Sequence, residues 1–452
     1  MKGRRLTGYR AIAILAAAGF LGLACSKDEL LNVDPEEAPG FVIPTVEVVL
    51  TPDEVEQWID SVFGGFNSAA SMLFMLAEKS TNLESQPMVI FNAPIQDTLF
   101  FFDTVAAAVD FDSLRMIVNI DTTRDNALAS AGTTLQLWSV EQGWDPGSAA
   151  WALAVDSPGV AVPWTAGPGG TLGQILDEVF LTELVDTTGV VTDSIVFDLT
   201  EYTDSLLSSW NDTSQVNTGL AMVIADSGSL ALQAPRLQYL IIPEFNPDTA
   251  IQVRCPSLTT ILRCLPATTY IFDDSAQPPP VGVLQTGGVD GWRSFVRVFL
   301  PDSVVLGDSA ENYTLRGATI NKAEYVITSL PAPAQPFGAE AGFDATAYQL
   351  ADNYLVLGAK TPVGARVAGS EFRIQPDSLE EGESIAIDLT LQVQAWADVP
   401  LDSVTPPITF MFRAFPEGST FGYWNFGAVD GDTAYRPIFR IVFTPVREFP
   451  VE

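Results

Sequence analysis

The segment that decides the fold is SIVFDLTEYTDSLLSSW at residues 194–210, because its pattern returns as SIAIDLTLQVQAW at residues 384–396. In both segments apolar residues alternate with polar ones up to a shared Asp-Leu-Thr. Alternation with a period of two predicts a strand with one buried face. Thr200 and Thr390 are then the expected caps of a short helix that ends near Trp210 and Trp396.

Three more segments are matched in both halves of the chain. The pairs, first copy before second, are QPMVIFNAP (86–94) with RSFVRVFLP (293–301), GLAMVIADSG (219–228) with ITFMFRAFPEG (408–418), and PRLQYLIIP (235–243) with PIFRIVFTP (437–445). Four elements in the same order predict an internal duplication.

The expected fold class is all-β, with two tandem jelly-roll-like antiparallel β-sandwiches and few short helices. The 452 residues suit two domains of roughly 200 residues, and 31 Pro and 34 Gly punctuate short apolar runs. The predicted division is a signal peptide at 1–24, a flexible tether at 25–40, a first sandwich at 41–245, a linker with a cysteine loop at 246–268, and a second sandwich at 269–452.

The best candidate for a helix is TPDEVEQWIDSVFGG at residues 51–65. Thr51 and Glu54 have the spacing of a capping box, and the apolar residues that follow have helical spacing. The two glycines at the end favour helix termination.

The first 25 residues form a leader. A basic stretch precedes an apolar run from Ala11 to Leu23, and Ala24 and Cys25 follow. An apolar run of ~13 residues is too short to span a bilayer and is typical of a secretory signal. A small residue directly before a cysteine resembles the lipobox of bacterial lipoproteins, although Gly22 stands where that family prefers leucine. Lipidation of Cys25 is therefore expected, with an ordinary signal peptide or a short membrane anchor as the alternative.

The acidic, proline-containing segment after Cys25 is typical of a flexible tether. Its first four residues, Ser26 to Glu29, resemble the signal that directs Bacteroidota-type lipoproteins to the outer face of the outer membrane. The resemblance implies a lipid-anchored protein of the cell envelope that is exposed at the cell surface. The two other cysteines, Cys255 and Cys264, close a ten-residue loop, and in an exported protein this favours a disulfide over two free thiols.

Charge excludes one class of partner. The chain has 22 basic and 56 acidic residues; Lys2, Arg4, Arg5 and Arg10 lie in the leader, so 22 − 4 = 18 basic groups face 56 acids, a net of −38. Such a field repels nucleic acid and anionic lipid, and it suits an extracellular protein or the binding of cations.

The chain contains no histidine, which excludes Ser-His-Asp catalysis, Cys-His catalysis and histidine-ligated metal sites. A carboxylate-dependent glycosidase or polysaccharide lyase needs only two acids, such as Asp110 and Asp112, but a solvated face explains that pair better. We therefore expect that the protein is not an enzyme.

Aromatic rings stack on the apolar faces of sugars, so clustered aromatic residues are the predicted ligand-binding groups. Trp138 and Trp144 lie in a tryptophan-rich stretch, and Tyr423 and Trp424 lie in a turn-rich one. Trp144 precedes an Asp-Pro-Gly turn, which predicts an exposed ring. The alternative is that these rings fill the sandwich cores.

A structural calcium ion is the one cofactor that the sequence leaves open. Hard cations bind clustered oxygen ligands, and the densest acidic loops hold Asp273 with Asp274 and Asp430 with Asp432. Turn formation without metal is the alternative, because Asp and Gly favour turns.

The ordered segments resemble the DNRLRE or disaggregatase-related family, whose domains are similar to carbohydrate-binding modules. The resemblance rests on MVIFNAP with FVRVFLP, ATINKAEYVI from Ala318, LQLWSVEQGWDPGSAAW from Leu135, and FDLT with IDLT. It implies a non-catalytic lipoprotein that binds a glycan or another cell-envelope or extracellular partner. The alternative is a purely structural or adhesive surface protein without a small ligand, in which the tryptophans are buried.

Overall fold

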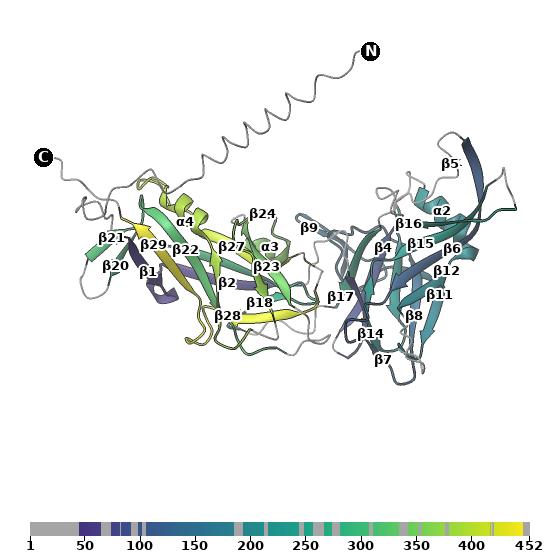
Figure 1. The fold of residues 1–452 in the computed structure, drawn as a ribbon, viewed down its shortest axis with the longest axis horizontal. Helices are drawn as coiled ribbons and strands as arrows, with labels where there is room; N and C mark the ends of the chain where they lie inside the picture. Colours follow the sequence, from purple (N-terminus) through teal and green to yellow (C-terminus); the bar gives the residue numbers. More distant parts are fainter. Residues whose placement is uncertain are drawn as a thin grey trace, which may run out of the picture. The chain divides into compact units, whose positions relative to one another are not determined.

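The computed structural model describes residues 45–64, 74–81, 83–91, 98–101, 105–184, 193–211, 216–243, 248–255, 266–273, 281–306, 311–333, 342–350, 354–375, 379–415, 417 and 420–445. The predicted all-β class is confirmed: antiparallel strands dominate the described residues, and the helices are short (Figure 1). None of the helices in this described part is long and apolar enough to cross a membrane.

The first sandwich is built by strands between residues 74 and 272. Its larger sheet has the order β11 (Leu172–Leu181), β8 (Thr133–Val140), β13 (Leu220–Ile224), β4 (Glu84–Ile90), β3 (Phe74–Lys79), β14 (Gly228–Gln233) and β7 (Ala127–Leu128), with β17 (Ala267–Phe272) also paired to β4. The second sheet has the order β12 (Ser194–Asp198), β6 (Val105–Asn119), β15 (Arg236–Pro243) and β16 (Ile251–Cys255), with β5 (Thr98–Phe101) on β6. β9 (Leu153–Ser157) pairs with β10 (Val160–Pro163).

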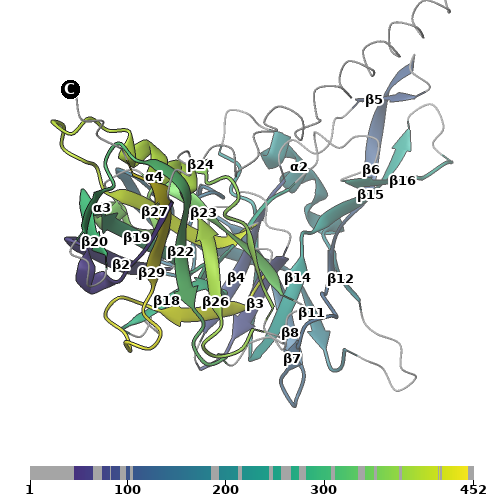
Figure 2. The same ribbon diagram turned by 60° about the vertical axis from the view of Figure 1, so that its left-hand side comes forward.

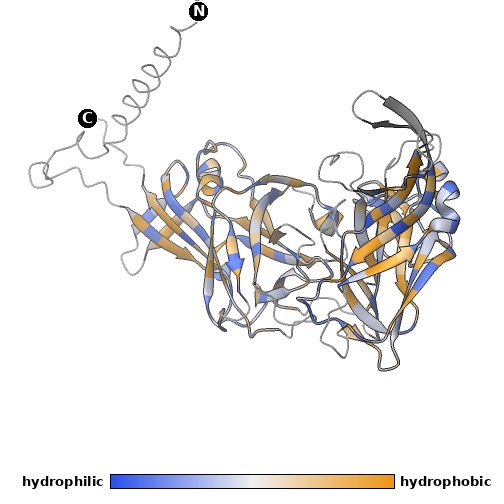
Figure 3. Cartoon of the chain, turned by 45° about the vertical axis from the view of Figure 1, so that its right-hand side comes forward, coloured by the Kyte–Doolittle hydropathy of each residue, from blue (hydrophilic) through white to orange (hydrophobic). Residues whose placement is uncertain are grey.

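The core of this sandwich lies between the two sheets, where apolar strand faces meet (Figure 3). Leu114 and Met116 of β6 belong to the same buried cluster as Leu135 and Leu137 of β8. These residues are spaced two apart, so the alternation of the sequence decides which face is buried.

The second sandwich follows the same plan (Figure 2). One sheet has the order β2 (Gln57–Phe63), β19 (Arg293–Phe299), β27 (Ile408–Phe415), β23 (Phe343–Leu350) and β24 (Val363–Arg366), with β25 (Phe372–Ile374) on β23. The other has the order β1 (Val46–Leu50), β29 (Ile438–Thr444), β22 (Thr319–Thr328) and β26 (Ser384–Asp388). Two small pairs are β18 (Val283–Gly287) with β28 (Tyr423–Gly427) and β20 (Ser303–Leu306) with β21 (Glu311–Thr314).

The short helices are α2 (Thr203–Asn211), α3 (Tyr354–Leu357) and α4 (Thr390–Ala397), with 3-10 turns η1 (Pro52–Glu54), η2 (Thr200–Tyr202) and η4 (Gly358–Lys360). α2 and α4 follow the two Asp-Leu-Thr segments, as the repeat predicts, but the predicted threonine caps are wrong, because Leu199 caps η2 and Leu389 caps α4. Thr200 Oγ1 donates to Asp198 Oδ1 at 2.5 Å, and Thr390 Oγ1 donates to Asp388 Oδ1 at 2.6 Å. The same local hydrogen bond ends the strand in both copies.

The duplication is also visible in the strand register. Asp198 of β12 pairs with Arg115 of β6, and Asp388 of β26 pairs with Glu324 of β22. The next residue donates to the central strand in both copies: Leu199 N to Leu114 O at 2.8 Å, and Leu389 N to Ala323 O at 2.9 Å. β6 and β22 are therefore equivalent central strands.

The strand pairing differs from the predicted division at the domain boundaries. The predicted boundaries put residues 46–63 in the first sandwich, yet β1 pairs with β29 and β2 pairs with β19 of the second. Conversely, β16 and β17, which span the predicted linker and the start of the predicted second sandwich, pair with β15 and β4 of the first. Figure 1 shows the purple N-terminal strands among the green and yellow strands of the second sandwich.

The predicted helix at 51–65 is wrong beyond its first turn. The Thr51 backbone N–H does donate to Glu54 Oε2 at 2.8 Å, as a capping box requires. After that turn the chain forms β2, which pairs with β19 over its whole length. Trp58 is buried and the other residues of β2 are half-buried or exposed, so pairing with β19 overrides the helical spacing of the apolar residues.

Candidate functional site

The predicted exposed ring of Trp144 is in fact buried, with 6% of its surface exposed. Its Nε1 donates to Thr218 O at 2.8 Å, and the ring belongs to a small core cluster with Trp164. The Asp-Pro-Gly turn after Trp144 is present: Ser148 N and Ala149 N both donate to Asp145 O. That turn directs the chain into the core, so the prediction of exposure is wrong.

The other predicted sugar-binding rings do not form a platform. Trp424 is fully buried and donates from Nε1 to Ser329 Oγ at 2.8 Å. Trp138 on β8 is half-buried, and its Nε1 lies 3.2 Å from Gln136 Oε1. Tyr423 is half-buried, and burial with the nearby charge of Asp290 raises the pKa of its hydroxyl.

All nine tryptophans lie in the described part of the chain, and none of them is exposed. Buried indoles are Trp58, Trp144, Trp164, Trp210, Trp396 and Trp424, and half-buried ones are Trp138, Trp151 and Trp292. Within the described residues, six tryptophans are therefore core residues, and the other three are only partly accessible.

The predicted calcium loops show turn chemistry. Asp432 Oδ1 accepts from Ala434 N at 3.0 Å, which is a turn bond of an acidic residue to its own backbone. The Asp273 backbone N–H donates to Glu84 O at 2.9 Å, and Asp274 lies outside the described residues. Among the described residues, no group of three or more acids or cysteines is arranged to hold a metal ion.

The predicted lipidation and disulfide sites are only partly covered. Cys25 and Cys264 lie outside the described residues. Cys255 ends β16, where its backbone pairs with Leu237 of β15. The disulfide and the lipid anchor therefore stay predictions.

Asp60 on β2 and Asp430 line a hollow of about 200 Å³ in the second sandwich. Asp60 Oδ2 accepts from Val429 N at 2.9 Å, and Asp60 Oδ1 accepts from Trp58 Nε1 at 3.1 Å. Burial raises the pKa of Asp60 to about 7, and the neighbouring charge of Asp430 adds to the rise. This carboxyl is held by strand-to-loop hydrogen bonds inside a fold, so we assign it a structural role.

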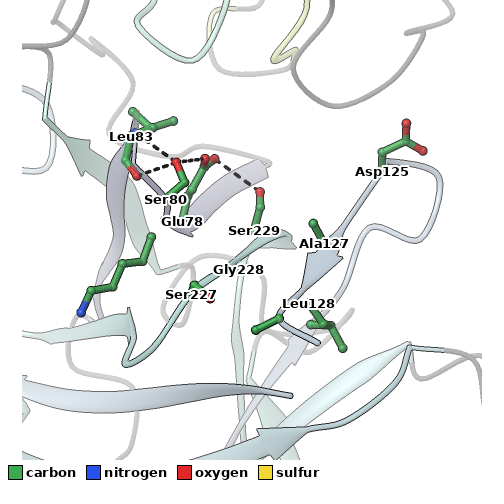
Figure 4. A pocket seen from close by; sticks show the side chains of 11 residues that line it. Glu78, Ser80, Leu83, Asp125, Ala127, Leu128, Ser227, Gly228 and Ser229 are labelled. Atoms are coloured by element: carbon green, nitrogen blue, oxygen red, sulfur yellow. Dashed lines mark hydrogen bonds between the residues drawn. The ribbon is translucent and has the colours of Figure 1, made fainter. Parts of the chain in front are cut away.

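A larger hollow, of about 480 Å³, opens where β3, β7 and β14 of the first sandwich meet (Figure 4). Glu78 at the end of β3 is its central polar side chain. Ser80 Oγ donates to Glu78 Oε1 at 2.9 Å, and Ser229 Oγ of β14 lies 3.4 Å from Glu78 Oε2. Ser80 is itself fixed by the hairpin turn, because Leu83 N donates to Ser80 Oγ at 3.1 Å.

The rest of the lining is largely apolar or backbone. Leu83, Ala127, Leu128 and Ala129 contribute the apolar groups, and Asp125 is an exposed acid beside them. Gly228 has a φ of +146°, and a Cβ there would lie 2.8 Å from Thr133 Oγ1. A side chain at position 228 would thus press against the site where β14 pairs with β7.

The electrostatics of this hollow favour a positively charged ligand. Burial raises the pKa of Glu78, while the hydrogen bonds from Ser80 and Ser229 act in the opposite direction. Lys79 also lines the hollow, and its Nζ donates to the backbone carbonyl of Ala225 at 2.8 Å. No ion pair of Glu78 occurs within the described residues.

Sequence reasoning missed this site. FMLAEKS at residues 74–80 is a strand with a polar end, which is the usual pattern where a strand enters a turn. Glu78 differs from other acids at strand ends only in the folded chain, where β14 places Ser229 beside it. The two residues are 151 positions apart in the sequence.

No protein-family model and no curated relative matches the sequence, so the resemblance to the DNRLRE family stays a prediction. Solved structures found by similarity include the C-terminal domain of the AgI/II polypeptide BspA of Streptococcus agalactiae, at 9% identity and a TM-score of 0.13, covering 89% of this chain and 92% of that one. Another is a structure of infectious bursal disease virus, Gt strain, at 10% identity and a TM-score of 0.11, covering 90% of this chain and 79% of that one. At these TM-scores the similarity carries no argument about fold or function.

Proposed function

We propose that the protein is a non-catalytic, lipid-anchored surface protein that binds a cell-envelope or extracellular partner protein. The contact that we assign to the partner is a lysine or arginine side chain inserted into the hollow around Glu78. The proposal rests on the half-buried carboxylate of Glu78, which accepts hydrogen bonds from two hydroxyl groups. It has no cationic partner among the described residues.

The lining of the hollow suits the chemistry of such a side chain. Lysine and arginine have apolar stems and a charged end, and the lining offers apolar groups next to the carboxylates of Glu78 and Asp125. A carboxylate in such a site accepts charge-assisted hydrogen bonds, which are about twice as strong as neutral ones. The excess of acids over bases in the chain also attracts a cationic partner over longer distances.

A glycan ligand is the second candidate, because Glu78 and Ser229 can also bond sugar hydroxyls. Its main support in the sequence was the set of aromatic rings, and the described tryptophans are buried or half-buried. We therefore favour a protein partner, and the experiment below includes a sugar arm.

The test is a calorimetric titration of the mature chain with acetyl-Leu-Lys-Leu-amide, its arginine and glutamine counterparts, and a panel of methyl glycosides. We expect the lysine or arginine peptide to bind and Glu78→Gln to weaken binding about 10- to 100-fold, the loss of a charged hydrogen bond. Glu201→Gln is the matched control, because Glu201 is exposed in η2 and the charge change is the same.

Binding should also weaken on acidification, since a protonated Glu78 no longer attracts a cation. If a methyl glycoside binds and Glu78→Gln abolishes that binding, the ligand of the hollow is a sugar and not a cation. Equal binding of the lysine and glutamine peptides, or no effect of Glu78→Gln, would contradict the proposal.

The location is part of the proposal and has a separate test. Cys25→Ser should release the chain from the membrane fraction and abolish incorporation of a labelled fatty acid. A Cys25→Ser chain that still carries the label would contradict lipidation at this residue.

A further inference from the structure

The second sandwich is completed by strands that precede the first sandwich in the chain. β2 pairs with β19, and β17 pairs with β4, at equivalent places in the two copies. β1 lies beside β29, and β16 lies beside β15, again at equivalent places. The first sandwich is thus completed by its own last two strands, β16 and β17. The second sandwich is completed by β1 and β2, at the start of the described chain.

The equivalence rests on the register of neighbouring strands. β4 pairs with β13 through Met88 and Ala221, and β19 pairs with β27 through Phe295 and Met411. These are the same positions of the repeated segments, so β4 and β19 occupy the same place in each sheet. The free edge of β4 takes β17, and the free edge of β19 takes β2.

Residues 45–64, which we name the closing segment, contribute core residues to the second sandwich. Val48, Leu50 and Trp58 are buried, with 6%, 3% and 8% of their surfaces exposed. The Trp58 ring lies 5.8 Å from that of Tyr325 and 5.9 Å from that of Phe439, between centroids.

Polar contacts fix the closing segment in register. Seven consecutive residues of β2 pair with β19, from Gln57 opposite Phe299 to Phe63 opposite Arg293. The Asp60 carboxylate accepts from the backbone N–H of Val429, outside the strand ladder. Without the closing segment, the edge of β19 and the aromatic rings of Tyr325 and Phe439 would meet water.

We propose that the acceptor edges of β19 and β29 are an interaction site for the closing segment of a second copy of this chain. The contacts of the closing segment with the second sandwich are made by residues that any copy carries, so a segment from another molecule would make them unchanged. Exchange of an identical element between protomers is a low-cost route to association. The closing segment leads directly into the first sandwich, so each exchanged segment links the second sandwich of one copy to the first sandwich of another.

Two products follow from the symmetry of such an exchange. Reciprocal donation gives a closed dimer, and one-way donation gives a ring or an open chain of copies. Within one chain, the pairing of β2 with β19 is an intramolecular step that does not depend on the protein concentration. Donation from a neighbouring copy competes best where copies are concentrated.

The test uses the paired positions Ile59 and Arg297, which face each other across β2 and β19 and are both half-buried. Residues paired across strands are close enough for a disulfide after substitution by cysteine. Full-length Ile59→Cys and Arg297→Cys chains, carrying different affinity tags, are co-expressed, purified and oxidised. A covalent dimer that holds both tags, in excess of the dimer given by the control pair below, indicates that one copy donates its closing segment to the other.

The matched control pair is Gln136 and Glu178, which face each other across β8 and β11 inside the first sandwich. We expect a mixed dimer from Ile59→Cys with Arg297→Cys at least several-fold above that from Gln136→Cys with Glu178→Cys. The double variant of Ile59 and Arg297 in one chain shows that the cysteines can react. An internal crosslink in that double variant, together with no mixed dimer above the control, would overturn the proposal.

Discussion

The backbone N–H of Val429 donates a hydrogen bond of 2.9 Å to Asp60 Oδ2, across 369 positions of the chain. The same carboxylate accepts from Trp58 Nε1 at 3.1 Å, so it joins the closing segment to a loop near the C-terminal end of the described chain. One partly buried acid therefore connects the two ends of the second sandwich.

This acid makes stability depend on pH. Burial raises the pKa of Asp60 from 3.8 to about 7, so between these values the unfolded chain is ionised while the folded chain keeps the proton. Stability from this group is therefore present at low pH and is lost as pH rises toward 7. The full loss is up to about 4 kcal/mol, at 1.36 kcal/mol for each pKa unit.

Asp60→Asn should remove that dependence, because an amide does not ionise. Urea unfolding at several pH values should show that the free energy of unfolding of Asp60→Asn increases relative to that of wild type as pH rises from 4 to 8. The reference variant is Glu56→Gln, which changes an exposed acid on the same segment and should show no such shift. A difference in free energy of unfolding that stays constant over this pH range would contradict the raised pKa of Asp60.

Trp58→Ala should destabilise the chain by about 3–5 kcal/mol, the usual cost of truncating a buried aromatic side chain. The ring is packed against Tyr325 and Phe439, so its removal leaves a cavity in the second sandwich. Urea unfolding measures the cost, and Trp58→Phe should recover part of it. A cost below about 1 kcal/mol would show that the closing segment is not part of that core.

Glu417→Gln should cost about 3–5 kcal/mol, because it breaks a buried ion pair and leaves its partner uncompensated. Arg293 Nε donates to Glu417 Oε1 at 2.7 Å, and Arg413 also contacts this carboxylate. The side chains of Arg293 and Glu417 are 1% and 6% exposed. Glu371→Gln, in the exposed pair with Arg366, should cost less than about 1 kcal/mol in the same unfolding assay. Equal costs for the two variants would contradict the prediction.

Asp198→Ala and Asp388→Ala should each cost about 1 kcal/mol, since each removes the same bonds at a strand-to-helix step. The hydrogen bond from Thr200 lowers the pKa of Asp198, so its contribution is present above the unfolded pKa and is lost as pH falls. Unfolding at pH 7 and pH 3 checks this: the cost of Asp198→Ala should shrink at pH 3. A large cost at only one of the two sites would argue against equivalent copies.

The repeated sequence was sufficient to predict the fold class and the strand-to-helix steps. Alternation around Ile195 and Ile385 decides which face is buried, and Asp-Leu-Thr forms a bond within three residues, so both are local. Equivalent positions of the two copies can hold different aromatic residues. Trp138 of β8 and Tyr348 of β23 hold the same place, because Leu137 pairs with Met222 and Ala347 with Phe412.

The strand partner of β2 and the exposure of the Trp144 ring could not be predicted from local sequence patterns. Both copies offer a free strand edge, at β4 and β19, and the sequence of β2, which lacks a period-two alternation, predicts neither edge. Trp144 precedes a turn in the sequence, but only the fold places Thr218 O within reach of its indole. Glu78 likewise gains its setting from β14, which is distant in sequence.

The most direct test of the central claim, that the closing segment belongs to the second sandwich, is hydrogen exchange of backbone amides in the Glu417→Gln chain. Weakening the second sandwich should make the amides of β2 exchange faster together with those of β19, while the amides of β4 and β13 keep their protection. If the amides of β2 instead kept their protection along with β4 and β13, the closing segment would belong to the first sandwich and the account would be wrong.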